Sequence, residues 1–259
     1  MSSWSSSVVM FPGAGSFGGE LRQLLRELEP PAWIVRYPGR FGKDFGRAAG
    51  SFEEVVQSCI AQVRRRESAR VVLVGHSFGA YVAYATAGKL EEQALDISAL
   101  VVVGAIAPSL LSVAESATRD RSDIAAYLDS IEVNLMSDES SSEWTDIVLD
   151  AAMQDLRLLR ESKVSEYRKV RCPVFAARGE MDPLTSTDAM REWAGATVGG
   201  CACRNFPGGH SDLLRSQEFR SWLREARAGG AEVLRQWDET SRRNSLLLPD
   251  SEEVTQAKG

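Results

Sequence analysis

The sequence is short of cysteine and histidine, the residues that build disulfide scaffolds and zinc sites. Its 259 residues include 4 cysteines and 2 histidines. The cysteines, Cys59, Cys172, Cys201 and Cys203, form no C-x-x-C pair, and two histidines add too few ligands for a structural zinc site. We therefore expect buried free thiols in a reducing cytosol, with no metal and no cofactor.

A long hydrophobic run is also missing. The longest nearly apolar stretch, Ala99–Leu111, contains glycine and proline and is shorter than the roughly 20 residues that a membrane-spanning helix needs. Met1–Ser7 is rich in serine and the first basic residue is Arg22, so the charged start of an export signal is absent. These features predict a cytoplasmic protein that does not associate with membranes.

An excess of positive charge is lacking as well. There are 36 acidic and 30 basic residues, a formal net charge of −6, which disfavours nucleic-acid binding. With 44% hydrophobic residues the chain can bury a core, which excludes disorder throughout. We expect one domain over residues 1–238, a polar flexible tail over 239–259, and a monomer.

Short β-branched runs alternate with helical patterns along most of the chain. Several runs, such as Arg70–Val74 and Ala99–Val103, are apolar on both faces, as in a parallel sheet covered by helices on both sides. Strands are also predicted at Ser7–Phe11, Ala32–Arg36, Pro173–Ala177 and Ala202–Phe206; helices are predicted at Gly19–Glu29, Ser51–Glu67, Ala80–Gln93, Leu213–Arg227 and Ala231–Asp238. The alternation indicates an α/β fold with a doubly wound, mostly parallel sheet.

This alternation is interrupted between about residues 107 and 169. The interruption is longer than a crossover needs and carries two helical patterns, Asp123–Met136 and Glu143–Glu161. A helical insertion in a parallel sheet commonly forms a lid over the carboxyl ends of the strands, where ligands bind. A surface insertion without functional role is the alternative.

The strongest motif is Gly75-His76-Ser77-Phe78-Gly79, placed between a predicted strand and a predicted helix. This is the context of a nucleophile elbow, in which a sharp turn holds the serine in a strained conformation and glycines avoid clashes with neighbouring elements. The motif predicts that Ser77 is a nucleophile, against the alternative of an ordinary turn between strand and helix.

Serine needs a base, and only His76 and His210 are available. His76 adjoins Ser77, so its side chain should point away from the hydroxyl. His210 ends the glycine-containing loop after the last predicted strand and is therefore the predicted base.

An orienting carboxylate is expected after a strand, between the serine and the histidine in sequence. Asp182 follows the predicted strand Pro173–Ala177 and is the preferred residue, with Glu180 as the alternative. A carboxylate here could otherwise cap a helix beginning at Pro183. The order Ser77, Asp182, His210 is that of an α/β hydrolase.

The first turn, Gly13-Ala14-Gly15-Ser16-Phe17-Gly18, also satisfies the dinucleotide-binding pattern G-x-G-x-x-G. That interpretation leaves the elbow and the two later loops without a role. In the hydrolase interpretation a backbone N–H near Ala14 and that of Phe78 would form an oxyanion hole. We therefore favour the hydrolase.

Five motifs together resemble a known family. Phe11–Gly15 looks like an FPxAG motif and Tyr37–Arg40 like a PGR motif; with Gly75–Gly79, Gly179–Asp182 and Gly208–His210 they resemble the type II thioesterases of polyketide and nonribosomal peptide assembly. The similarity runs from about Val8 to Arg224. The sequence departs from the family at Gly13, where many members carry a bulkier residue, and at Ser16-Phe17, where a further glycine is common.

The resemblance implies an α/β-hydrolase fold and an editing activity. Members release stalled acyl groups from the phosphopantetheine arms of acyl or peptidyl carrier protein domains of the synthases. It implies Ser77 as nucleophile, His210 as base, Asp182 as orienting acid, and the amides of Ala14 and Phe78 as oxyanion hole. Two alternatives stay open: a small-molecule carboxylesterase, and a non-catalytic module that binds an acyl group or a partner protein.

The substrate contacts are less defined by sequence. Apolar side chains of the insertion could line an acyl chamber or could simply pack the insertion onto the core: Leu128, Ile131, Leu135, Ile147 and Leu156. Arg40 could frame the pantetheine entrance, but a surface arginine in a local salt bridge is the preferred interpretation. Arg64–Arg66 could meet an acidic carrier protein, although a solvated helix end is favoured.

Overall fold

Six parallel strands form the central sheet of the part of the chain that the computed structural model describes, residues 6–28, 32–66, 70–131, 142–228 and 234. The order across the sheet is β2-β1-β3-β4-β5-β6. The strands are β1 (Ser7–Phe11), β2 (Ala32–Ile34), β3 (Arg70–His76), β4 (Asp96–Val103), β5 (Val174–Gly179) and β6 (Cys201–Phe206). Because all pairs are parallel, the loops that follow the strands lie at one edge of the sheet.

Residues of β1 and β3 alternate between two hydrophobic cores, one on each face of the sheet. Val9 and Phe11 of β1 pack on the face covered by α2 (Phe52–Arg64) and α3 (Phe78–Glu92). Val8 and Met10 pack on the opposite face, with α1 (Arg22–Glu27) and a helix over residues 217–228. Both faces of the strands are therefore buried, which explains their continuous apolar runs.

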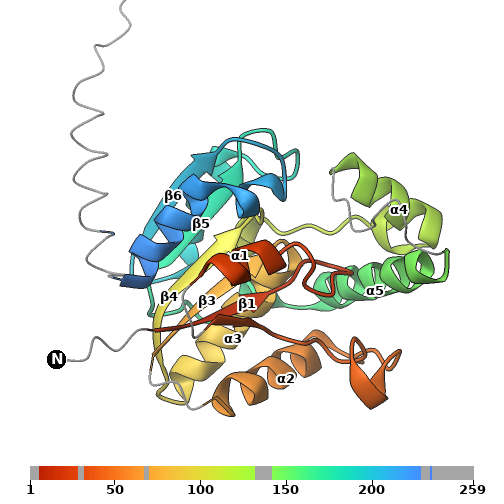
Figure 1. Cartoon of the computed structure of the whole chain (residues 1–259), viewed down its shortest axis with the longest axis horizontal. Coiled ribbons are helices and arrows are strands. Elements are labelled where there is room, and N and C mark those ends of the chain that lie inside the picture. The colour runs from red at the N-terminus through yellow and green to blue at the C-terminus, as the bar shows by residue number, and fades with distance from the viewer. Residues whose placement is uncertain (1–5, 29–31, 67–69, 132–141, 229–233, 235–259) are drawn as a thin grey trace, which may run out of the picture.

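The interruption of the α/β alternation is a helical insertion between β4 and β5. It contains α4 (Arg121–Ser130) and α5 (Ser142–Glu161), which pack on each other. Figure 1 shows α4 and α5 together beyond one end of the strands, on the right of the view. Val148, Leu149, Ala152, Leu156 and Leu159 of α5 are buried, so the insertion is packed onto the rest of the protein.

Most predicted elements are present, with altered ends. β3 continues to His76 and α3 begins at Phe78, so the turn between them is reduced to Ser77. The helix predicted at Leu213–Arg227 is interrupted: a short 3₁₀ helix, Asp212–Arg215, precedes Ser216, whose hydroxyl accepts a hydrogen bond from the Phe219 amide (3.0 Å) at the start of the following helix.

Three further outcomes concern helices. α6 (Thr187–Arg191) was not predicted, because its five residues are too few to show a periodic pattern. α4 ends at Ser130, and residues 132–136 of the helix predicted at Asp123–Met136 lie outside the described residues. The helix predicted at Ala231–Asp238, apart from Leu234, and the predicted tail over 239–259 lie outside the described residues. Within the described ranges, no helix is long and apolar enough to cross a membrane.

Candidate active site

Ser77 lies at the sharp turn between β3 and α3. Its backbone dihedrals, φ 53° and ψ −121°, are unusual for a residue with a side chain, as the elbow motif predicts. The flanking glycines are required by close packing: a Cβ on Gly75 would lie 2.5 Å from Cα of Ala80, and a Cβ on Gly79 would overlap the carbonyl oxygen of Phe11. Ser77 is half-buried, at the N-terminal end of α3.

Asp182 and His210 form a buried pair. The His210 Nδ1 atom lies 3.0 Å from Asp182 Oδ2. Asp182 is held in turn by the Leu184 amide, 2.9 Å from Oδ1, and by the Thr185 hydroxyl, 2.9 Å from Oδ2. Glu180, the alternative carboxylate, is exposed. The loops after β5 and β6 therefore bring the preferred acid to the predicted base.

The surroundings of His210 and Asp182 lower the pKa of both side chains. Burial lowers the pKa of His210, helped by the charge of His76 and opposed by the hydrogen bond and the charge of Asp182. Burial would raise the pKa of Asp182, but the hydrogen bond and charge of His210, with the Leu184 and Thr185 donors, lower it below its ordinary value. Near neutral pH the pair is thus a neutral imidazole beside a carboxylate.

Ser77 and His210 line the same cavity, with a volume of about 430 Å³. The Nε2 atom of His210 is buried and has no hydrogen-bond partner among the described residues, so it is not bonded to the Ser77 hydroxyl. Gly104, at the end of β4, lies under the ring, where a Cβ would come within 3.0 Å of His210 Cε1. If His210 donates Nδ1–H to Asp182, its Nε2 lone pair is available to accept a proton.

His76 makes contacts away from the Ser77 hydroxyl. Its Nε2 lies 3.3 Å from the carbonyl oxygen of His210, and the two rings are 5.0 Å apart between centroids. Its Nδ1 lies 3.8 Å from Oε1 of Glu20, beyond hydrogen-bond distance. His76 therefore supports the loop that carries His210.

The loop after β1 is held by carboxylates on both sides of Ala14. The Gly13 amide donates to Glu20 Oε1 (3.0 Å) and the Gly15 amide donates to Asp155 Oδ2 (2.9 Å). Burial would raise the pKa of Glu20, but His76 and the Ser16 and Gly13 donors lower it. Phe78 is the first residue of α3, so its amide has no acceptor within the helix.

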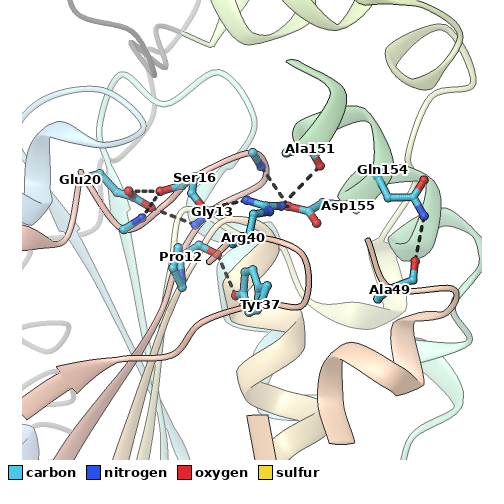
Figure 2. Close-up of polar contacts among 12 residues, drawn as sticks. Pro12, Gly13, Ser16, Glu20, Tyr37, Arg40, Ala49, Ala151, Gln154 and Asp155 are labelled. Carbon is cyan, nitrogen blue, oxygen red and sulfur yellow. Dashed lines mark hydrogen bonds and ion pairs between the residues drawn. The ribbon is translucent and has the colours of Figure 1, made fainter. Parts of the chain in front are cut away.

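Arg40 of the PGR motif was expected on the surface in a local salt bridge, and that expectation is wrong. It is 6% exposed, and its partner is Asp155 of α5, with Nη2 and Oδ2 2.5 Å apart. Nη1 also donates to the Ser16 carbonyl oxygen (2.7 Å). Figure 2 shows the Arg40 side chain between the loop after β1 and α5. Burial raises the pKa of Asp155, opposed by Arg40 and by the Gly15 amide.

A second cavity adjoins Ser77, with a volume of about 180 Å³. Its lining is mostly apolar: Phe78, Tyr81, Ala105, Ile106, Leu111, Val113, Ala117, Leu156, Leu159 and Leu184. Leu156 lines both cavities, and Leu128 and Ile131 line the larger one. Ile147 instead lines a separate cavity beside the PGR loop, and Leu135 lies outside the described residues.

The Arg64–Arg66 segment lies away from both cavities. It ends α2 and precedes the amino end of β3, whereas Ser77 follows the carboxyl end of that strand. Arg64 donates to Gln93 Oε1 (2.8 Å), and the Arg66 guanidinium stacks over Trp33 at 4.0 Å from the ring centroid. These contacts favour the interpretation as a helix end. Two other arginines, Arg22 and Arg215, are exposed and line the Ser77 cavity.

Sequence reasoning missed three residues of this region: Glu20, Gly104 and Asp155. Gly104 directly follows the predicted strand Ala99–Val103, and a glycine at a strand end can indicate that another segment approaches closely. Glu20 lies in the predicted helix after the glycine turn, and a contact with His76 has no signal in the sequence. Asp155 lies within a periodic helix, but it occupies the buried face, where an isolated carboxylate indicates a partner.

The dinucleotide interpretation of the first turn is disfavoured. Asp155 and Glu20 already accept the amides of Gly15 and Gly13, so two carboxylates occupy the place where a pyrophosphate would bind. No group of three or more potential metal ligands occurs within the described ranges. All four cysteines are free; Cys59 and Cys172 are buried as expected, and Cys201 and Cys203 are half-buried.

Comparisons with known sequences identify the family of the chain. A family model described as "Thioesterase domain" matches residues 6–228. The chain is 30% identical over 210 residues to thioesterase PikA5 of Streptomyces venezuelae, which covers 78% of this chain and 74% of that protein. It is 26% identical to a probable cadicidin biosynthesis thioesterase of Streptomyces griseus, covering 80% of this chain and 58% of that protein.

A solved structure shares the fold. The type II thioesterase BorB from the borrelidin biosynthetic cluster superimposes with a TM-score of 0.76 and 24% identity, covering 86% of this chain and 93% of BorB. This match confirms the expected α/β-hydrolase fold. Together with the sequence matches, it confirms the resemblance that the FPxAG and PGR motifs indicate.

Proposed function

The chain belongs to the thioesterase domain family, and on this premise we propose that it hydrolyses acyl thioesters carried on the phosphopantetheine arms of carrier proteins. Ser77 is the nucleophile, His210 the base, Asp182 the orienting acid, and the amides of Ala14 and Phe78 the oxyanion hole. The partners are acyl or peptidyl carrier protein domains of polyketide or nonribosomal peptide synthases in the cytoplasm. The similarity to a probable cadicidin biosynthesis thioesterase supports a role in a biosynthetic pathway.

One observation carries the proposal. His210 is hydrogen-bonded to Asp182 at Nδ1, and His210 and Ser77 line the same cavity. Acyl transfer requires an imidazole that is oriented by a carboxylate and shares a cavity with a nucleophilic serine. Catalytic hydrogen bonds often tighten only when substrate is bound, which accounts for the unpartnered Nε2.

The reaction proceeds in two steps. The Ser77 oxygen attacks the thioester carbonyl while His210 Nε2 takes its proton, and the carbonyl oxygen gains charge between the two amides. Collapse breaks the carbon–sulfur bond, and His210 returns the proton to the departing thiolate. Water then attacks the acyl-enzyme through the same base and releases the carboxylic acid. A lost oxyanion donor typically lowers the rate by about 10²–10³.

The two cavities suggest which part of the substrate binds where. The apolar cavity of about 180 Å³ suits the acyl chain, because apolar walls favour burial of methylene groups. The larger cavity has polar and charged residues at its rim, including Arg22 and Arg215, and suits the pantetheine arm and its phosphate. In this arrangement α4 and α5 act as the lid.

An oxygen-ester substrate is the competing possibility, because the same groups cleave carboxylesters. The test is hydrolysis of acyl groups of increasing length loaded on carrier protein, beside matched acyl-pantetheine thioesters and oxygen esters. We expect faster turnover of thioesters, and a loss on the order of 10⁶ in kcat for Ser77→Ala. Preference for oxygen esters would overturn the proposed substrate.

A serine-directed fluorophosphonate distinguishes an enzyme from a binding module. The reagent should label Ser77 in the folded wild-type protein and leave Ser77→Ala unlabelled. Ser58→Ala is the matched control, because Ser58 lies on α2 and lines neither cavity. Failure to label folded wild-type protein would favour a module that binds acyl groups without turnover.

A further inference from the structure

Three segments that are distant in sequence meet at Arg40. Its guanidinium donates to the Ser16 carbonyl oxygen of the loop after β1 and to Asp155 of α5. A weaker contact, 3.5 Å, joins Nη2 to the Ala151 carbonyl oxygen on the same helix. Arg40 and Asp155 are both buried, with side chains 6% and 7% exposed. Figure 2 shows these contacts around one point. Because little water screens these two charges, their electrostatic interactions with neighbouring groups are strong.

Asp155 contacts the loop directly as well as through Arg40. Its Oδ2 accepts the Gly15 amide at 2.9 Å, so a helix of the insertion supplies the acceptor for a backbone amide in the loop after β1. The packing there is close: Gly15 has φ +72°, and a Cβ on it would lie 2.7 Å from the Ala152 Cβ on α5. The loop and α5 are therefore in direct contact, with no room for a larger residue.

These contacts determine the backbone around Ala14. The Gly13 amide is held by Glu20 and the Gly15 amide by Asp155, one on each side of Ala14. Because peptide units are planar, fixing the two neighbouring units leaves the Ala14 amide little freedom to rotate. Glu20 belongs to the segment that follows the loop, whereas Asp155 belongs to the insertion. Of these two carboxylates, only Asp155 belongs to α5.

We propose that Asp155, held by Arg40, is a positioning residue through which the insertion helix α5 sets the oxyanion loop. This inference rests on the proposed function, since it assigns a consequence to the Ala14 amide. When α5 is seated, the amide points to the developing oxyanion; when α5 is displaced, Asp155 leaves with it and the Gly15 anchor is lost. Efficient hydrolysis therefore requires α5 to be packed against the loop after β1.

The test begins with Asp155→Asn, which keeps the size of the side chain and removes its charge. We expect kcat to fall by about 10- to 100-fold with KM within twofold, because misplacing an oxyanion donor raises the barrier without weakening substrate binding. Asp150→Asn is the matched control: Asp150 lies on the same helix and is paired with Arg121 on the surface. Its kcat should stay at the wild-type value.

A purely structural role is separated by a double variant. Arg40→Met with Asp155→Leu replaces the pair by apolar side chains, an exchange that often preserves stability. We expect its Tm to exceed that of Asp155→Asn while kcat remains low, because no acceptor is left for the Gly15 amide. Recovery of kcat along with Tm would overturn the proposal, as would equal kcat values for Asp155→Asn and Asp150→Asn.

A readout without turnover keeps this inference distinct from the proposed function. Hydrogen exchange of a peptide covering residues 12–18 should be faster in Asp155→Asn and unchanged in Asp150→Asn. If wild-type Ser77 fails to react with fluorophosphonate, the proposed function fails, whereas the anchoring is still decided by exchange. Unaltered exchange in Asp155→Asn would refute the anchoring even in an active enzyme.

Discussion

The Nδ1 atom of His210 lies 3.0 Å from Oδ2 of Asp182, and both side chains are fully shielded from solvent. This pair joins the loops that follow β5 and β6, neighbouring strands of the sheet. Its isolation from water strengthens the interaction, and the opposite ring nitrogen, Nε2, makes no hydrogen bond among the described residues.

Asp182→Asn should lower kcat on the order of 10⁴-fold with little change in KM, because the amide neither enforces the required tautomer nor stabilises the imidazolium. Steady-state kinetics on an acyl-pantetheine thioester measures this. Glu180→Gln is the control, since Glu180 is exposed two residues away and should keep wild-type activity. Comparable losses in both variants would contradict the assignment of Asp182.

The pH profile should report the His210 base. Burial lowers the pKa of His210 from its ordinary value of 6.5, and Asp182 opposes this shift. The base works when neutral, so kcat/KM should stay constant near neutrality and fall only as the pH drops through a pKa below 6.5. In Asp182→Asn this acidic limb should move to still lower pH. An acidic limb above 6.5 in the wild type would argue against His210.

Gly179→Ala should destabilise the protein by about 3 kcal/mol, because the new Cβ would overlap the Gly209 carbonyl oxygen in the loop that carries His210. Chemical denaturation measures the free energy of unfolding. Gly195→Ala is the matched control, since a Cβ there meets no atom within 4 Å. A small and equal effect of both changes would mean that the His210 loop adapts freely.

Val113→Phe should narrow the apolar cavity of about 180 Å³ next to Ser77. We expect kcat/KM to fall by about 10-fold or more for long acyl chains and little for acetyl. Each methylene group that no longer fits in the cavity lowers kcat/KM by roughly a factor of 10. Val198→Phe provides the control, as Val198 is 71% exposed and lines neither cavity. Unchanged chain-length preference would exclude this cavity as the acyl site.

Replacing both Arg22 and Arg215 by Ala should raise KM for carrier-bound thioesters by about three- to tenfold, the effect of losing two exposed charge contacts. KM for a short thioester without phosphate should not change. Arg26→Ala, a change on the same helix as Arg22 but away from the cavity, should match wild type. An equal rise for both substrates would indicate a general distortion of the cavity.

The sequence predicted the sheet well because its strands are buried on both faces and its motifs occur at strand ends. Apolar runs such as Arg70–Val74 have no other favourable environment, and Gly75 and Gly79 are required by contacts with adjacent backbone. Boundaries were less accurate where a short segment is stabilised by packing, as in α6, or where a cap interrupts a helix, as at Ser216.

The amino-acid sequence alone determined the α/β alternation, the turn at Ser77 and the identity of the only two histidines, because these depend on local pattern and composition. Only the tertiary structure decided between Asp182 and Glu180 as the partner of His210. It also showed that Arg40 is buried against Asp155 and that Glu20 lies beside His76. Those choices depend on which distant segments share a water-excluded space. Ion pairs between buried residues that are far apart in the sequence produce no periodic pattern from which they could be predicted.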